Sequence, residues 1–242
     1  MDVKRLFALV VAAALGYLTS SLASAGTINI NPSKDNTLYE YDPLDGDKSN
    51  ALGFHFFAGE TGMKELRRGV VAFDIAGNVP SGSTITAVSL SANMSRTPTN
   101  TAYVVELRRL LADWGEGTSV APGEEGDGAP ATANDATWRH RFFDTTFWSA
   151  QGGDFSATVS ASQMVGGVGQ YMWSSAQMVV DVQGWLDNPA SNFGWLLLGN
   201  ESVAGSTKRF DTRESASPPV LTIQYVRATP GPRPRPTPPP RP

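Results

Sequence analysis

The residues best suited to chemistry in this chain are aromatic rings and arginines in or beside predicted loops. Residues 138–142 read WRHRF, and in an extended backbone the rings would share one face while the two arginines share the other. Flat rings stack on the faces of sugars, and guanidinium groups bind carboxylates or sulfates. These residues therefore predict a polysaccharide-binding surface, formed by Trp138, Arg139, Arg141 and Trp148, with Trp114 in a neighbouring loop.

A second interpretation of the same residues stays open. Tryptophan is largely buried in most proteins, so the rings could equally pack in the core while the arginines balance nearby acids. Arg68 lies in a predicted strand, and we expect it to pair with a buried acid, Asp74 or Asp181.

Metal and catalytic chemistry have little support in the sequence. The chain has no cysteine and only two histidines, His55 and His140, which excludes disulfides, thiol catalysis and a three-histidine metal site. Residues 123–128 (GEEGDG) are a weak Ca²⁺ candidate, because they lack the regular ligand spacing of a calcium loop and fit a solvated acidic loop better. No hydrolase or nucleotide-binding motif is present, so we predict that the protein is not an enzyme.

Both ends of the chain differ from its middle. Residues 1–25 have a basic start, an apolar run from Leu6 to Leu18 and a final Ala-Ser-Ala, the pattern of a cleaved secretory signal. The apolar run is too short to span a bilayer, so we expect an extracellular protein with no membrane span after cleavage. Residues 229–242 (TPGPRPRPTPPPRP) predict an extended polyproline spacer or a solvated tail.

The distribution of charge excludes one class of partner. The formal net charge is −4, of which the signal carries +1 and the tail +3, so residues 26–228 carry −8. A nucleic-acid-binding domain normally presents a basic surface, and this domain is acidic. We therefore expect no nucleic-acid partner; the loop aromatics and the signal sequence favour a polysaccharide or a component of the cell envelope instead.

The middle of the chain reads as one domain of strands and turns. Apolar and polar residues alternate in 88–95 and 221–225, which is typical of half-buried strands. Further strands are predicted at 69–75, 102–110, 178–182 and 194–198. One short helix is predicted where Asp181 could cap a turn before Asn188-Pro189 ends it, and residues 112–136 predict a long loop. We predict an all-β fold, an antiparallel β-sandwich of jelly-roll type, over residues 26–228.

Several short motifs follow one another along the chain. They are RGVVAFDI at 68–75, Ile85 to Leu90, DWGEGT at 113–118, ATW at 136–138, DVQGWLDNPASNFG at 181–194, RES at 213–215 and PPVL at 218–221. In this order and spacing they resemble the DNRLRE domain, which is grouped with the family 96 carbohydrate-binding modules. The stretch that matches best is 181–194, and Asp35-Asn36 resembles the opening, although Thr37 stands where the family has arginine.

The resemblance implies a secreted β-sandwich, in a family where some members bind acidic polysaccharide. It also adds Glu116, from the Trp-x-Glu-Gly motif, to the expected site beside Trp114. We thus expect a non-catalytic polysaccharide-binding or cell-surface module. The alternative is a structural or adhesive extracellular domain that is attached through its Pro-rich tail and has no sugar site.

Overall fold

A computed structural model describes residues 24–227. Almost all of the predicted signal and the whole Pro-rich tail lie outside these residues, and the first strand begins at Ala25. The first half of the domain contains β1 (Ala25–Ile30), β2 (Lys34–Tyr39), β3 (Lys48–Ser49), β4 (His55–Glu60), β5 (Leu66–Ala72), β6 (Thr84–Arg96) and β7 (Tyr103–Leu110). The second half contains β8 (Ala129–Pro130), β9 (His140–Phe142), β10 (Thr146–Phe147), β11 (Phe155–Val165), β12 (Gly169–Ser174), α1 (Ala176–Asp187), a 3₁₀ turn (Pro189–Ser191), β13 (Trp195–Leu198), β14 (Lys208–Asp211) and β15 (Val220–Val226).

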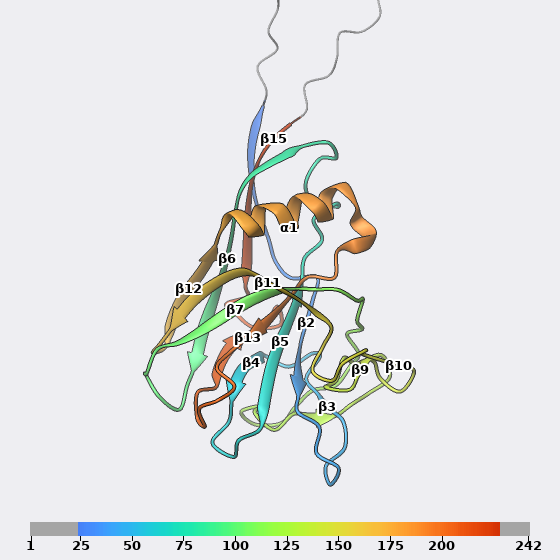
Figure 1. The fold of residues 1–242 in the computed structure, drawn as a ribbon, viewed down its shortest axis with the longest axis vertical. Coiled ribbons are helices and arrows are strands. Elements are labelled where there is room, and N and C mark those ends of the chain that lie inside the picture. Colours follow the sequence, from blue (N-terminus) through green and yellow to red (C-terminus); the bar gives the residue numbers. More distant parts are fainter. Residues whose placement is uncertain (1–23, 228–242) are drawn as a thin grey trace, which may run out of the picture.

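The predicted all-β antiparallel architecture with one short helix is confirmed. Eleven strands form one hydrogen-bonded sheet in the order β1-β15-β6-β14-β4-β5-β13-β7-β11, with β12 added beside β6 and β2 beside β5. The sheet curls around its own interior, and α1 lies across it (Figure 1). Strand β4 joins the two halves because it pairs with β14 on one side and with β5 on the other. The division into two stacked layers stays a prediction.

The strand pattern in the sequence corresponds to burial in the structure. In β6, Leu90, Ala92 and Met94 are buried while Ser91 and Asn93 between them are partly exposed. Strand β15 buries Leu221, Ile223 and Tyr225 in the same way. Both strands therefore direct one apolar face into the largest core cluster, where burial of apolar surface stabilises the fold.

The helix differs from its prediction in where it begins. Its N-cap is Ser175, whose side chain accepts a hydrogen bond from the backbone of Met178, so the predicted strand at 178–182 is wrong. The predicted end of the helix, at Asn188, is confirmed. Asp181 lies inside the helix and caps nothing; it is buried and faces the sheet. None of the helices that the structure describes is long and apolar enough to cross a membrane.

The two ends of the described chain leave the domain side by side. In the register of β1 and β15, Ala25 lies opposite Val226, and the backbone of Arg227 donates a hydrogen bond to the carbonyl of Ser24. Strand β6 starts here, since Thr84 also pairs with Val226, and it ends at Arg96, which pairs with Arg209 of β14. The short strands β3, β9 and β10 gather towards the end of the domain opposite the chain ends (Figure 1).

Candidate functional site

All six tryptophans are buried, which contradicts the prediction of exposed indole platforms. Trp114 is 1% exposed, Trp138 7% and Trp148 5%. These three pack in a second core cluster with Leu38, Val70 and Leu110, among others. The indole nitrogen of Trp114 donates to the carbonyl of Phe193, and that of Trp148 donates to the carbonyl of Thr137. Trp114 and Trp148 therefore anchor the long loops on the sheet, because their buried indoles also satisfy their polar N–H groups.

Arg68 reaches a different acid from either predicted one. Its guanidinium binds Glu201, with Nε 2.6 Å from Oε1 and Nη2 2.9 Å from Oε2. The same group lies over the ring of Trp138 at 4.7 Å from its centroid. This two-point ion pair therefore covers the outer side of Trp138, so that ring has no free face for a sugar.

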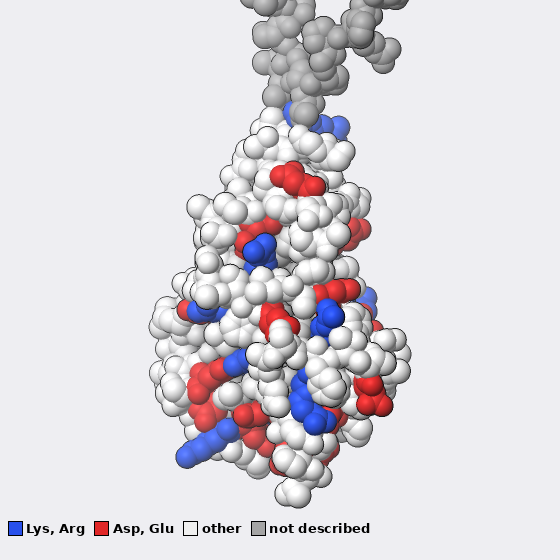
Figure 2. All heavy atoms as spheres, turned by 45° about the vertical axis from the view of Figure 1, so that its right-hand side comes forward, with Lys and Arg blue, Asp and Glu red and all other residues white. Residues whose placement is uncertain are grey.

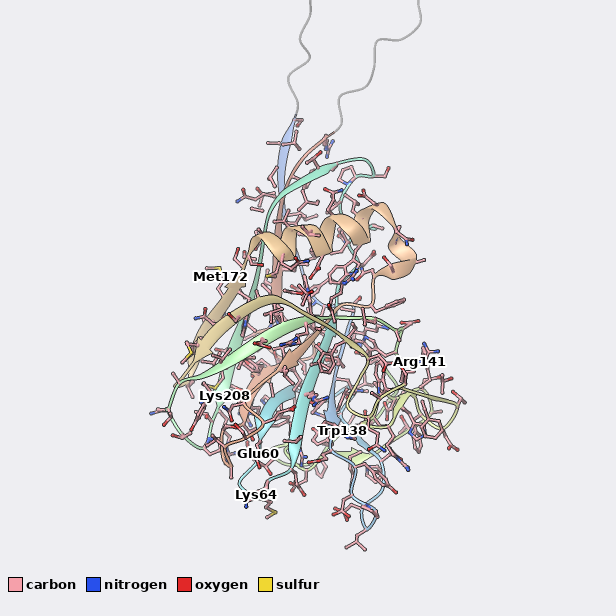
Figure 3. All side chains as sticks on the ribbon, in the orientation of Figure 1. Glu60, Lys64, Trp138, Arg141, Met172 and Lys208 are labelled. Atoms are coloured by element: carbon pink, nitrogen blue, oxygen red, sulfur yellow. The ribbon has the colours of Figure 1, made fainter. Side chains whose placement is uncertain are left out.

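Arg139 and Arg141 do not converge on one site. Arg139 binds the buried carboxylate of Asp47 and lies 3.7 Å from the centroid of the Tyr41 ring. Arg141 instead extends away from the domain, while Trp138 lies further inside (Figure 3). The only hydrogen bond that Arg141 donates within the described residues is a long one, 3.4 Å, to the carbonyl of Asp113. Of the two arginines, Arg141 is therefore the one that keeps most of its donors available.

Glu116 also has a structural partner. It receives both Nε and Nη2 of Arg213, the second at 2.5 Å, and it accepts the backbone N–H of Asp35 at 2.8 Å. Glu214 binds the same arginine at 2.9 Å. The motif residues near 35, 116 and 213 thus join three distant segments into one partly buried network, and Glu116 has little capacity left for a ligand.

The groove beside β9 and β10 is the best candidate site near the predicted residues. We call it the Phe147 groove; it has a volume of 460 Å³ and is lined by Leu111, Ala112, Arg141, Phe147, Trp148, Ser149 and Asp154. Phe147 is 62% exposed and Leu111 52%, so the groove presents an aromatic and an aliphatic side chain to solvent. It combines an apolar surface, a cation and an anion, which are the groups that fix the orientation of a polar ligand.

The ring of Phe147 is held in place from beneath. It packs on the imidazole of His140 with 4.2 Å between the ring centroids. His140 is itself buried and fixed by Thr137, whose hydroxyl lies 3.2 Å from Nδ1. An exposed ring with a rigid support loses little conformational entropy when a ligand stacks on it.

Asp154 supplies a stable negative charge to the same groove. Its two oxygens accept the backbone N–H groups of Ser149 and Ala150, each at 3.0 Å. Partial burial opposes ionisation, but these hydrogen bonds and the charge of Arg141 prevail and hold the pKa of Asp154 below its usual value. The groove therefore carries an ionised carboxylate that accepts hydrogen bonds from hydroxyl groups.

The comparisons with known proteins add no relative. No protein-family model matches the chain, and no curated protein matches it. The resemblance to the DNRLRE domain therefore rests on the motifs alone.

The predicted acidic loop at 123–128 is not a solvated one throughout. Glu125 is 5% exposed and binds Asn50, the backbone of Phe54 and both the backbone and the ring of His55. Glu124 binds two arginines, Arg96 and Arg209. Within residues 24–227, no group of three or more His, Asp or Glu side chains is arranged to hold a metal ion.

Sequence reasoning missed both Phe147 and Asp154, two residues that line the groove. Residues 147 and 148 are neighbours in an extended segment, so their side chains point to opposite sides. The sequence shows two adjacent aromatics, and it does not show which of them faces the core.

On the face drawn in Figure 2, acidic and basic side chains alternate over the lower part of the molecule, without a large area of one sign.

Proposed function

We propose that this chain is a secreted, non-catalytic domain that binds polysaccharide in the Phe147 groove. The observation behind the proposal is the exposed ring of Phe147, which packs on His140 and is flanked by Arg141 and Asp154. A sugar ring can stack on the phenylalanine while its hydroxyl groups, or a carboxylate, bind the two charged side chains. The signal-like sequence at the start of the chain supports an extracellular location.

Replacement of Phe147 with alanine tests this proposal. In affinity gel electrophoresis of the full chain against neutral and acidic polysaccharides, we expect Phe147→Ala to weaken retardation about tenfold, because a stacking face is lost. Arg141→Gln should weaken retardation by acidic polymers more than by neutral ones, since it removes a cation.

Phe54→Ala is the matched control, because Phe54 is also an exposed phenylalanine, at 57%, but lies outside the groove. It should leave retardation unchanged. If no polysaccharide retards the wild-type chain, or if Phe54→Ala has the same effect as Phe147→Ala, the proposal is wrong.

A structural or adhesive role is the second candidate, and the burial of all six indoles favours it. In that case the domain would be retained at a surface through residues 229–242. Deletion of this segment should then abolish cell association while Phe147→Ala changes nothing, as measured by fractionation of cells that express each variant. Loss of cell association in Phe147→Ala, with the tail intact, would reject this candidate.

A further inference from the structure

A second hollow lies at the end of the domain opposite the chain ends. We call it the Arg209 pocket; it has a volume of 210 Å³, and its lining includes Phe57, Arg67, Arg96, Pro98, Glu124 and Arg209. Three of its residues are arginines and a single one, Glu124, is an acid. It shares no residue with the Phe147 groove.

The sheet itself places two arginines next to each other. Arg209 of β14 and Arg96 of β6 are direct partners in the antiparallel register. Like charges opposite each other on neighbouring strands destabilise a sheet. The pair therefore favours an anion that lies between the two guanidinium groups.

Glu124 supplies that anion from a loop. Its Oε2 lies 2.5 Å from Nη1 of Arg96 and 2.5 Å from Nη1 of Arg209, so one oxygen joins both groups. The two guanidinium groups hold the pKa of the Glu124 carboxyl below its usual value. Its side chain is 67% exposed, however, and exposed ion pairs contribute little free energy. A ligand carboxylate can therefore replace it at small cost.

The arginine side of the pocket is fixed, in contrast to Glu124. Arg209 is 13% exposed, and its Nε donates to the hydroxyl of Ser95. The neighbouring wall, at Thr97 and Pro98, is held by Lys208, a buried ammonium group. Lys208 donates to the hydroxyl of Thr97 and to the carbonyls of Thr99, Thr101 and Gly166, at 2.9 to 3.1 Å. The guanidinium group of Arg209 and the wall beside it thus keep their positions when Glu124 leaves.

We propose that the Arg209 pocket binds a carboxylate carried on a ring-sized body, as in a hexuronate unit of an acidic polysaccharide, and that Glu124 occupies the anion position until the ligand displaces it. The arginine pair holds the carboxylate by charge-assisted hydrogen bonds. The walls formed by Phe57 and Pro98 contact the ring. This inference rests on the proposed polysaccharide binding, and it adds a second site, for acidic sugar units, that is separate from the Phe147 groove.

Titration of the ¹⁵N-labelled full chain with glucuronate tests the inference. We expect saturable shifts in the amide signals of residues that line the pocket, such as Thr97, Gly126 and Thr207, and no such shifts with glucose. Glu124→Ala should bind glucuronate about fivefold more tightly, because the competing carboxylate is gone. Arg96→Gln and Arg209→Gln should each weaken glucuronate binding, by about fivefold or more. Arg96 is 57% exposed at the end of its strand, so its variant tests the pocket with little risk to folding.

Asp187→Ala is the control for charge, since it removes one exposed carboxylate at the end of α1 that does not line the Arg209 pocket. The inference is overturned if Glu124→Ala binds no more tightly than Asp187→Ala. Equal binding of glucose, or equally tight binding of inorganic sulfate, would also overturn it. Phe147→Ala should leave the glucuronate titration of the Arg209 pocket unchanged. A failure of the Arg209 proposal is therefore distinguishable from a failure of the Phe147 groove to retard the chain in polysaccharide gels.

Discussion

Replacement of Asp181 with alanine should lower the free energy of unfolding by about 3 kcal/mol, because it removes the acceptor shared by three buried or half-buried donors. Asp181 is 4% exposed. Its Oδ2 accepts from the hydroxyl of Ser160 at 2.5 Å and from the indole of Trp195 at 3.0 Å, and its Oδ1 accepts from Gln177. Loss of the carboxylate leaves the indole N–H of Trp195 without a partner and disconnects α1 from β11 and β13. Urea unfolding followed by tryptophan fluorescence measures the change.

Two further variants separate the hydrogen bonds from the charge. Asp181→Asn keeps an oxygen acceptor and removes the buried charge, so we expect a change of less than about 1 kcal/mol. Asp187→Ala, at an exposed position of the same helix, should change stability by less than about 0.5 kcal/mol. A loss in Asp187→Ala as large as that in Asp181→Ala would show that the helix, and not the buried carboxylate, is responsible.

Replacement of Asp35 with asparagine should stabilise the protein, by about 1–2 kcal/mol at pH 7 and less at pH 4. Asp35 is fully buried, and its Oδ1 has no hydrogen-bond partner. Burial raises the pKa of Asp35 well above its usual value; the backbone N–H of Arg213 opposes this shift, and the charges of Glu214 and Glu116 add to it. The folded protein therefore keeps the Asp35 carboxyl group protonated at a pH where the same group in the unfolded chain has lost its proton.

The sign of the pH dependence follows from that difference. When a carboxyl group has a higher pKa in the folded protein than in the unfolded chain, its contribution to stability is complete below the unfolded-state pKa. That contribution is lost as the pH rises through the folded-state pKa. The gain in Asp35→Asn should therefore increase from pH 4 to pH 8, as measured by thermal unfolding at each pH. Asp154→Asn provides the contrast: its pKa is lowered, so removal of its charge should destabilise, and more at pH 7 than at pH 3. An Asp35→Asn difference that is constant with pH would contradict this account.

Much of the fold could be predicted from the pattern of apolar residues. Strands β6 and β15 lie where the sequence placed them, because a buried face repeats every second residue. Strand β13 is buried on both faces, so it was predicted from a continuous apolar run instead. The predicted strand at 178–182 is wrong because its apolar residues fit a strand and a helix equally well. The side chain of Ser175 caps the chain just before this segment and stabilises the helix. Which strands pair with which depends on contacts between distant residues, and a single sequence does not show them.

The candidate site was harder to predict, for a physical reason. Tryptophan and arginine are suited both to sugar binding and to the packing of loops on a sheet, and here Trp138 and Arg68 do the second. Arg141 keeps most of its side-chain donors free, whereas Arg139 binds the carboxylate of Asp47. Burial depends on the course of the loop, so composition and spacing could name the side chains but not the faces they present.

The arrangement of the two chain ends has a mechanical consequence. Because Ala25 lies opposite Val226 where both ends leave the sheet, a force that separates them loads the first backbone pair of β1 and β15 alone. The hydrogen bonds of this ladder then break one after another, as in a zipper, instead of sharing the load in shear. A domain held by either end alone carries no tension across this ladder, whereas one stretched between two attachments would open at this edge first.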